Sequence, residues 1–423
     1  MKQSIQFGAG NIGRGFISAL LRQSNYEVIF ADINIQMVDA LRERGQYTVF
    51  ITDHEPDSFV IDNVSALETS DPALIEKICD SDVITTAVGL SVLPKIAPVI
   101  AGGIEKRAGR RKEAFLNIIA CENGVRATSE LKKEVLPLLS DEGKQYCEQW
   151  VGFVDCSVDR IVPPFKTDKT GDVCVERFYE WNMDCTQIKG ELHIEGVHLV
   201  DNLPAYIERK LFTLNTGHAI IAYLGYMKGY DTIEQSIADP DILSIVRAAM
   251  HESGAALSRK FGLDIDEHVA YCEKIIKRFR NYYLNDTVVR IGRDPLRKLS
   301  PGDRLIAPLT TAYGYGLPVD NLLLGTGAAL HFQYPGDPQS VRMQEMIRET
   351  GLSGAIGEIT GIAADSDLNN KMIKAYKDVA AFSPLAVKKM EIISTAGIDA
   401  KLVSDLLKKA REYNYDILLK YIS

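Results

Sequence analysis

The stretch Phe7–Gly15 reads FGAGNIGRG and follows a short apolar run, Ser4–Phe7, near the start of the chain. We expect a strand before the glycines and a helix after them. The glycines then have distinct tasks: Gly8 permits a tight turn, Gly10 lets a pyrophosphate approach the backbone, and Gly13 lets helix and strand pack closely. Free amide groups at the start of the helix would face the phosphates. The stretch therefore predicts a dinucleotide-binding turn.

The next predicted strand ends at Asp32, at the distance of about 20 residues that such a site requires. A carboxylate there accepts both ribose hydroxyls of an adenosine but repels a 2′-phosphate, so NAD is favoured over NADP. The alternative is that Asp32 only caps the following helix. Asn123 follows a later strand and could reach the nicotinamide ribose, or it could belong to a plain turn. The predicted cofactor-binding residues are Gly8, Ala9, Gly10, Asn11, Ile12, Gly13, Asp32 and Asn123.

The first half of the chain alternates short β-branched runs with helical patterns, which predicts a parallel sheet covered by helices on both faces. The candidate strands are Ser4–Phe7, Glu27–Ala31, Val83–Val88, Leu116–Ala120 and Val151–Val154. The helical patterns between them are Ile12–Ser24, Ile35–Arg44, Pro72–Ile78, Leu93–Ile104 and Gly124–Leu139. Tyr47–Val60, with a turn near Asp53, predicts an antiparallel edge ribbon, and Lys166–His198 predicts a second β-rich stretch.

Beyond Asn202 long helical periodicities dominate and strand patterns almost disappear. The fold class that we expect is α/β: an N-terminal Rossmann-type doubly wound sheet and a mainly α-helical C-terminal domain. We place the cofactor domain at residues 1–195 and the helical domain at 196–423, with 386–423 as a C-terminal helical tail.

The composition excludes several kinds of partner. With 46% apolar residues and a net charge of -9, the chain lacks the basic surface of a nucleic-acid or anionic-membrane binder. It has no run of the roughly 18 apolar residues that a membrane helix needs, and its start does not resemble a signal peptide, so we expect a cytoplasmic protein. The seven histidines show no metal-ligand spacing, and we expect no metal.

The segment ERKLFTLNTGH, residues 208–218, contains the candidate reacting groups. On an α-helix, Asn215 lies roughly 140° and His218 roughly 80° around the axis from Lys210, so the three share one sector. Reduction of a ketone requires a proton donor and fixed dipoles for the developing alkoxide, and a lysine, an amide and an imidazole supply them. The alternative is a lysine that extends to solvent and a structural histidine.

Six blocks together resemble the bacterial mannitol-1-phosphate 5-dehydrogenases, members of the polyol-specific long-chain dehydrogenases. They are FGAGNIGRGFI, TTAVG, NIIACEN, VDRIVPP, ERKLFTLNTGHA and GRDPLRKLSPGDRL, and the resemblance runs from Met1 to about Ala380. It implies a zinc-independent enzyme that interconverts mannitol 1-phosphate and fructose 6-phosphate with NAD. By the same resemblance Lys210 is the general acid and base, Asn215 lies in the oxyanion site and His218 orients the substrate.

Two departures from the family pattern accompany the resemblance. Relatives that act on unphosphorylated mannitol have an oxyanion-binding asparagine just before the VDRI block, where this chain has Asp155, and we do not carry that role over. The tail beyond about Val387 is longer than we expect for the family.

A phosphorylated substrate needs cations, and a short segment of the helical domain is rich in them. The alternative is a solvated basic face that pairs with Asp294 and Asp303. The candidate phosphate-binding residues are Arg290, Arg293, Arg297 and Lys298, with Arg304 nearby.

Other functions remain open at this point. Within the family, a hexuronate reductase acting on tagaturonate or fructuronate and a mannitol 2-dehydrogenase are the alternatives; outside it, an NAD-sensing regulator. The partner that we expect is a small sugar phosphate, and the chain could be a monomer or a homodimer.

Overall fold

A computed structural model describes residues 2–52, 56–163, 165 and 167–381 of the chain. These residues form two compact units, one up to Ile207 and the other from Glu208 onward. The predicted tail at 386–423 and the predicted turn at Asp53 lie outside the described residues.

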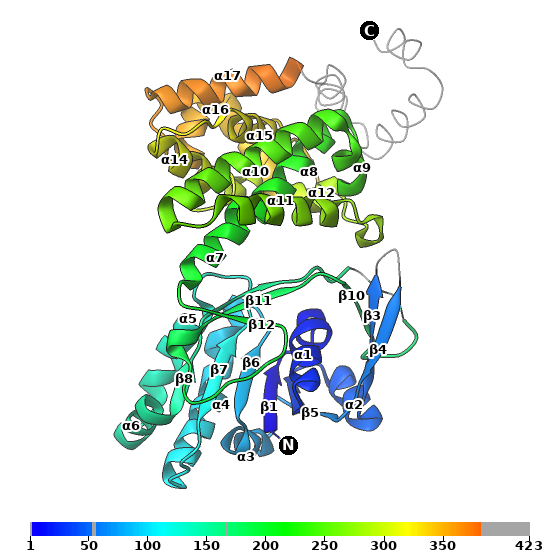
Figure 1. Cartoon of the computed structure of the whole chain (residues 1–423), viewed down its shortest axis with the longest axis vertical. Helices are drawn as coiled ribbons and strands as arrows, with labels where there is room; N and C mark the ends of the chain where they lie inside the picture. Colours follow the sequence, from blue (N-terminus) through cyan, green and yellow to red (C-terminus); the bar gives the residue numbers. More distant parts are fainter. Residues whose placement is uncertain (1, 53–55, 164, 166, 382–423) are drawn as a thin grey trace. The chain divides into compact units, whose positions relative to one another are not determined.

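The first unit is built on a six-stranded sheet in the order β5-β2-β1-β6-β7-β8 (Figure 1). Every neighbouring pair is parallel, and the order is that of a doubly wound dinucleotide-binding sheet. The predicted Rossmann-type fold is therefore confirmed. Its strands are β1 Lys2–Phe7, β2 Tyr26–Asp32, β5 Val64–Glu68, β6 Val83–Thr86, β7 Leu116–Ala120 and β8 Val151–Phe153.

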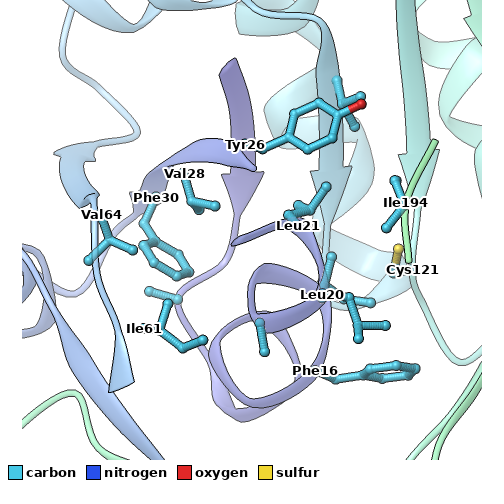
Figure 2. Close-up of a cluster of buried hydrophobic side chains, with 14 of the residues drawn as sticks. Phe16, Leu20, Leu21, Tyr26, Val28, Phe30, Ile61, Val64, Cys121 and Ile194 are labelled. Atoms are coloured by element: carbon cyan, nitrogen blue, oxygen red, sulfur yellow. The ribbon is translucent and has the colours of Figure 1, made fainter. Parts of the chain in front are cut away.

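Helices cover both faces of this sheet because successive strand side chains point to opposite sides. Ile29 packs with α3, α4 and their neighbours, whereas Val28 and Phe30 face the other way. Figure 2 shows this second face, where Phe16 and Leu20 from the first helical segment belong to the same buried cluster as Phe30. The helices are η1 Gly13–Ile17, α1 Ser18–Gln23, α2 Ile35–Arg44, α3 Ala73–Asp80, α4 Leu93–Gly109, α5 Ala127–Val135 and α6 Asp141–Trp150.

Two three-stranded sheets complete the first unit, in the orders β10-β3-β4 and β12-β11-β9. The antiparallel ribbon predicted at Tyr47–Val60 is confirmed as the β3–β4 pair. β9 lies before the second β-rich stretch that we predicted. The strands are β3 Tyr47–Thr52, β4 Asp57–Ile61, β9 Cys156–Asp159, β10 Val173–Glu176, β11 Glu180–Asp184 and β12 Val197–Val200.

One charged side chain is wholly enclosed in the first unit. Arg107 on α4 has no exposed surface, and its guanidinium donates to the carbonyl oxygens of Cys79 and Ser81 at 2.8 Å each. It also donates to the carbonyl of Ala114 at 2.8 Å and to the Tyr146 hydroxyl at 3.1 Å. Hydrogen bonds to neutral oxygens replace water around this cation.

The second unit is helical. In its described part, strand-like pairing occurs at an isolated bridge between Thr232 and Thr287. Helix α8 is almost entirely buried and contacts α9, α10, α12 and α15 (Figure 1). The predicted α-helical C-terminal domain is confirmed. The helices of this part of the chain are α7 Leu203–Arg209, η5 Lys210–Asn215, α8 Thr216–Lys228, α9 Ile233–Ala238, α10 Pro240–Phe261, α11 Ile265–Phe279, α12 Val288–Gly292, α13 Pro295–Lys298, α14 Ile306–Gly314, α15 Asp320–Leu330, α16 Pro338–Thr360 and α17 Asp367–Ala381.

Candidate active site

The glycine-rich turn lies where the chain order of the main sheet reverses, between β1 and β6. The Gly8 amide donates to the Ala31 carbonyl at 2.8 Å, and the Ala87 amide donates to the Phe7 carbonyl at 2.8 Å. Gly8 has φ of +90°, and a Cβ there would lie 2.5 Å from the Ala87 carbonyl oxygen. Glycine is therefore required at the point where the turn leaves the strand.

The other two glycines of the turn differ in the space around them. A Cβ on Gly13 would collide with the Gly8 carbonyl oxygen, so this glycine allows the helix to pack against the turn. Gly10 has no heavy atom within 4 Å of a built Cβ. An open backbone at Gly10 leaves room for a pyrophosphate, and the turn therefore fits a dinucleotide.

Asp32 is tied to this turn by its side chain. Its Oδ2 accepts the Ala9 amide at 2.6 Å, and its Oδ1 accepts the Asn34 amide at 2.8 Å. The helix-capping role that we considered for Asp32 belongs to Asn34, whose side chain accepts the Met37 amide at 3.2 Å. Each carboxylate oxygen retains a further lone pair, which a ribose hydroxyl can use.

The Arg14 side chain supports the glycine-rich turn through hydrogen bonds, a role that the sequence alone does not indicate. The side chain is buried; its Nε donates to the Gly171 carbonyl at 2.9 Å, and its Nη1 donates to the Ala9 carbonyl. The Tyr47 hydroxyl donates to the Arg14 carbonyl at 2.7 Å. Burial lowers the pKa of Arg14 from its ordinary value. Of the predicted neighbours, Asn11 is exposed and Ile12 is half-buried.

A second loop at the same sheet edge is shaped by Glu122, which the sequence analysis did not select. Its buried carboxylate accepts the Thr86 hydroxyl at 2.6 Å, the Val88 amide at 2.9 Å and the Gly89 amide at 2.8 Å. Glu122 thereby joins the ends of β6 and β7. Asn123, the residue that we predicted, follows it and is exposed.

Asp155, the residue that departs from the family pattern, makes hydrogen bonds within the first unit. It is buried, and its carboxylate accepts the Ser129 amide at 2.8 Å and the Ser129 hydroxyl at 2.5 Å.

In the second unit, Lys210–Asn215 form a π-helix between α7 and α8. The Thr216 amide donates to the Leu211 carbonyl, five residues back. An i→i+5 bond closes a wider turn than an α-helix does, so Lys210 and Asn215 lie one turn apart along the axis. The 140° separation that we derived from ideal α-helical geometry is therefore wrong for this segment.

Exposure separates the candidate reacting groups from their neighbours. Lys210, Asn215 and His218 are half-buried. The residues between them are mostly buried: Phe212, Thr213, Leu214, Thr216 and Gly217. The structure thus brings the predicted lysine, amide and imidazole to one accessible strip of the helix.

His218 is held from two sides. Its ring stacks on Phe279 with centroids 4.9 Å apart, and its Nε2 lies 3.4 Å from Asp286 Oδ2. Asp286 is buried, and its other oxygen, Oδ1, accepts from the Arg290 guanidinium. Its carbonyl accepts the Ile233 amide at 2.8 Å, which fixes the backbone at this position. Asp286 lies 68 residues beyond His218 in the chain and has no sequence motif that marks it.

The predicted phosphate-binding cations differ from one another in their exposure and in their partners. Arg297 lies 3.3 Å from Asp303, and Lys298 is buried with its ammonium donating to the Arg293 carbonyl. Burial, with the nearby charges of Arg304 and Arg297, lowers the pKa of Lys298 to about 7. Arg293 is exposed and has no carboxylate within 4 Å among the residues that the structure describes.

A buried histidine lies behind the π-helix. His268 on α11 is 3% exposed, its Nε2 is 3.4 Å from the Thr213 hydroxyl, and a Cβ on Gly254 of α10 would collide with its ring. Burial lowers the pKa of His268 to about 4; the positive charges of Arg209 and His251 act in the same direction, and a hydrogen bond with the Met250 backbone opposes them.

Within residues 2–52, 56–163, 165 and 167–381, no group of three or more histidine, cysteine, aspartate or glutamate side chains is arranged to hold a metal ion. None of the helices in this described part of the chain is long and apolar enough to span a bilayer.

The doubly wound sheet and its glycine turn define the first unit as a dinucleotide-binding domain, and a helical unit follows it in the chain. Two family models match the chain in succession: the mannitol dehydrogenase Rossmann domain over residues 2–196 and the mannitol dehydrogenase C-terminal domain over residues 202–380. The chain belongs to the mannitol dehydrogenase family and is a polyol oxidoreductase.

Solved structures share the fold at low sequence identity. The ternary complex of Pseudomonas fluorescens mannitol 2-dehydrogenase with NAD and D-mannitol has a TM-score of 0.66 and 17% identity, covering 96% of this chain and 94% of that one. A D-sorbitol dehydrogenase in substrate-free form has a TM-score of 0.74 and 15% identity, covering 95% and 94%.

Proposed function

We propose that the protein interconverts D-mannitol 1-phosphate and D-fructose 6-phosphate with NAD, without a metal ion. Residues 1–195 bind the cofactor in this proposal, and the helical part beyond residue 196 binds the substrate. The observation that carries it is the π-helix, which sets Lys210 and Asn215 one turn apart on the accessible strip that also contains His218.

The cofactor would be held by the first unit. Residues 8–13 offer an open backbone at Gly10 for the pyrophosphate, and Asp32 offers carboxylate lone pairs to the adenosine ribose. Asn123 stands beside Glu122 at the neighbouring strand end, within the edge where nicotinamide ribose would lie. The carboxylate of Asp32 repels a 2′-phosphate, which favours NAD over NADP.

The nicotinamide, when bound, supplies the hydride in reduction and accepts it in oxidation. Lys210 donates a proton from its ammonium group to the ketose oxygen as the carbon is reduced, and the neutral amine removes the hydroxyl proton in the reverse direction. The Asn215 amide donates a hydrogen bond to the same oxygen while its negative charge develops. His218 orients the substrate hydroxyls.

The phosphate preference rests on the charge of one segment. Residues 286–304 contain five cations and three carboxylates, and Arg293 is exposed without a carboxylate close by in the described structure. An arginine in this state is suited to a phosphate monoester. Arg290, Arg297 and Lys298 add positive potential around it, although each already donates to an oxygen of the protein.

The test is NADH oxidation with fructose 6-phosphate beside fructose, tagaturonate and fructuronate, with a chelator present. We expect turnover with fructose 6-phosphate alone. Equal turnover with fructose would instead indicate a mannitol 2-dehydrogenase, and turnover with a uronate a hexuronate reductase. NAD binding without turnover of any of these would favour a sensor.

Two variants test the roles. Lys210→Ala is expected to lower kcat by ~100-fold or more with NADH affinity unchanged, because a general acid and base is lost. Lys277→Ala, an exposed lysine on α11, is the matched control. Arg293→Ala is expected to raise KM for fructose 6-phosphate; an unchanged KM would refute its phosphate contact.

A further inference from the structure

The carboxylate of Asp286 stands between two groups that the proposed function places at the substrate. Its Oδ2 is 3.4 Å from His218 Nε2, and its Oδ1 accepts from Arg290. Asp286 is buried, so it cannot exchange these partners for solvent. The Ile233 amide holds its backbone, and the bridge between Thr232 and Thr287 holds the next residue.

The hydrogen-bonding capacity of the three groups decides the arrangement of protons. An ionised carboxylate only accepts, and an arginine guanidinium only donates. When the His218 ring is neutral, the proton must therefore lie on Nε2, which faces Asp286. Nδ1 then has a lone pair and acts as an acceptor.

We propose that Asp286 is a positioning residue that sets the tautomer of His218 to Nε2–H while it also anchors Arg290. An Nδ1 acceptor would receive a hydrogen bond from a hydroxyl of a polyol, the substrate class of the proposed function on which this part of the inference rests. Because Phe279 stacks on the His218 ring, it fixes the plane of the ring and so the direction in which Nδ1 can accept that hydrogen bond.

The isosteric variant Asp286→Asn gives a sharp test. Because Arg290 can only donate, the amide oxygen must face Arg290 and the NH2 group must face His218 Nε2. Nε2 then has to accept, and the ring proton moves to Nδ1. In the double variant Asp286→Asn with Arg290→Met, the amide is free to rotate, and the Nε2–H tautomer is expected to return.

The tautomer is measured by long-range ¹⁵N–¹H NMR of the full-length, ¹⁵N-histidine-labelled protein, at a pH where the ring is neutral. The His218 signal is assigned from its loss in His218→Gln. His331, whose Nε2 lies 2.8 Å from the Tyr376 carbonyl, serves as an internal Nε2–H standard and reports intact folding of each variant.

Asp286→Asn with the tautomer unchanged would overturn the proposal, as would a switch caused by Arg290→Met alone. Kinetics give a second readout: we expect kcat/KM for the polyol to fall by about 10- to 100-fold in Asp286→Asn, with NADH affinity unchanged. The NMR experiment needs no ligand. A wild-type enzyme without the proposed activity would therefore refute the function and leave the role of Asp286 to be decided by the tautomer.

Discussion

Acidification from pH 7 to pH 5 is expected to destabilise the second unit through His268. In the folded protein the pKa of this buried ring is about 4, whereas its ordinary value is 6.5. Between these values the unfolded chain binds a proton that the folded protein does not, so the free energy of unfolding falls as the pH falls from 6.5 toward 4. The full difference is about 3 kcal/mol, of which about 2 kcal/mol is lost by pH 5.

The assay is urea unfolding followed by far-UV circular dichroism at pH 7 and pH 5, for the wild type and His268→Gln. Hydrogen exchange of α10 and α11 shows whether the change lies in the second unit. Tryptophan fluorescence cannot report on that unit, because Trp150 and Trp181 both lie in the first unit. The glutamine variant is expected to lose about 2 kcal/mol less than the wild type over this range. His198→Gln, an exposed histidine, is the control.

A parallel loss of stability in the wild type and His268→Gln would refute the reasoning. It would mean that the ring is protonated in the folded protein at pH 5. Because the ring lies beside Thr213 in the π-helix, a confirmed loss would also link acid inactivation to the segment that contains Lys210.

Three further changes test the first unit. Asp32→Ser is expected to raise the ratio of NADPH to NADH kcat/KM by ~10-fold or more, because the repulsion of a 2′-phosphate is removed; an unchanged ratio would place the adenosine elsewhere. Glu122→Gln replaces one of the two carboxylate oxygens, which accept the Val88 and Gly89 amides, by an NH2 donor and is expected to weaken NADH binding by ~10-fold in calorimetry; unaltered affinity would mean that this loop does not touch the cofactor. Arg107→Met leaves buried carbonyls unpaired and is expected to lower the free energy of unfolding by ~3 kcal/mol or more, against ~0.5 kcal/mol or less for the exposed Arg110→Met.

Local periodicity was sufficient to predict most of the main sheet. Leu116–Ala120 and Ile35–Arg44 begin and end in the structure where we predicted them, because a buried parallel strand and an amphipathic helix each have a clear pattern. Val64–Glu68 was missed because its five residues mix polar and apolar types without a strong alternation, and its neighbour β2 decides its conformation.

The candidate site was only partly predictable for a different reason. The residue types at Lys210, Asn215 and His218 indicate chemistry, but a π-helix has no compositional pattern that separates it from an α-helix. Asp286 and Glu122 act through contacts that depend on the fold, and common acidic residues in loops carry no local motif.

The π-helix also bears on how the length of this chain can change. Such a turn is an α-helix with one residue more than its register needs, so loss of any one residue between Lys210 and Asn215 would let an ordinary helix form. Four α-helical residues advance about 400°, close to one turn, so Lys210 would stay near Asn215 and on the strip that it shares with His218. A deletion within α8 would instead turn every preceding side chain by about 100° relative to the residues after it, so a one-residue change of length is tolerated best within the π-helix itself.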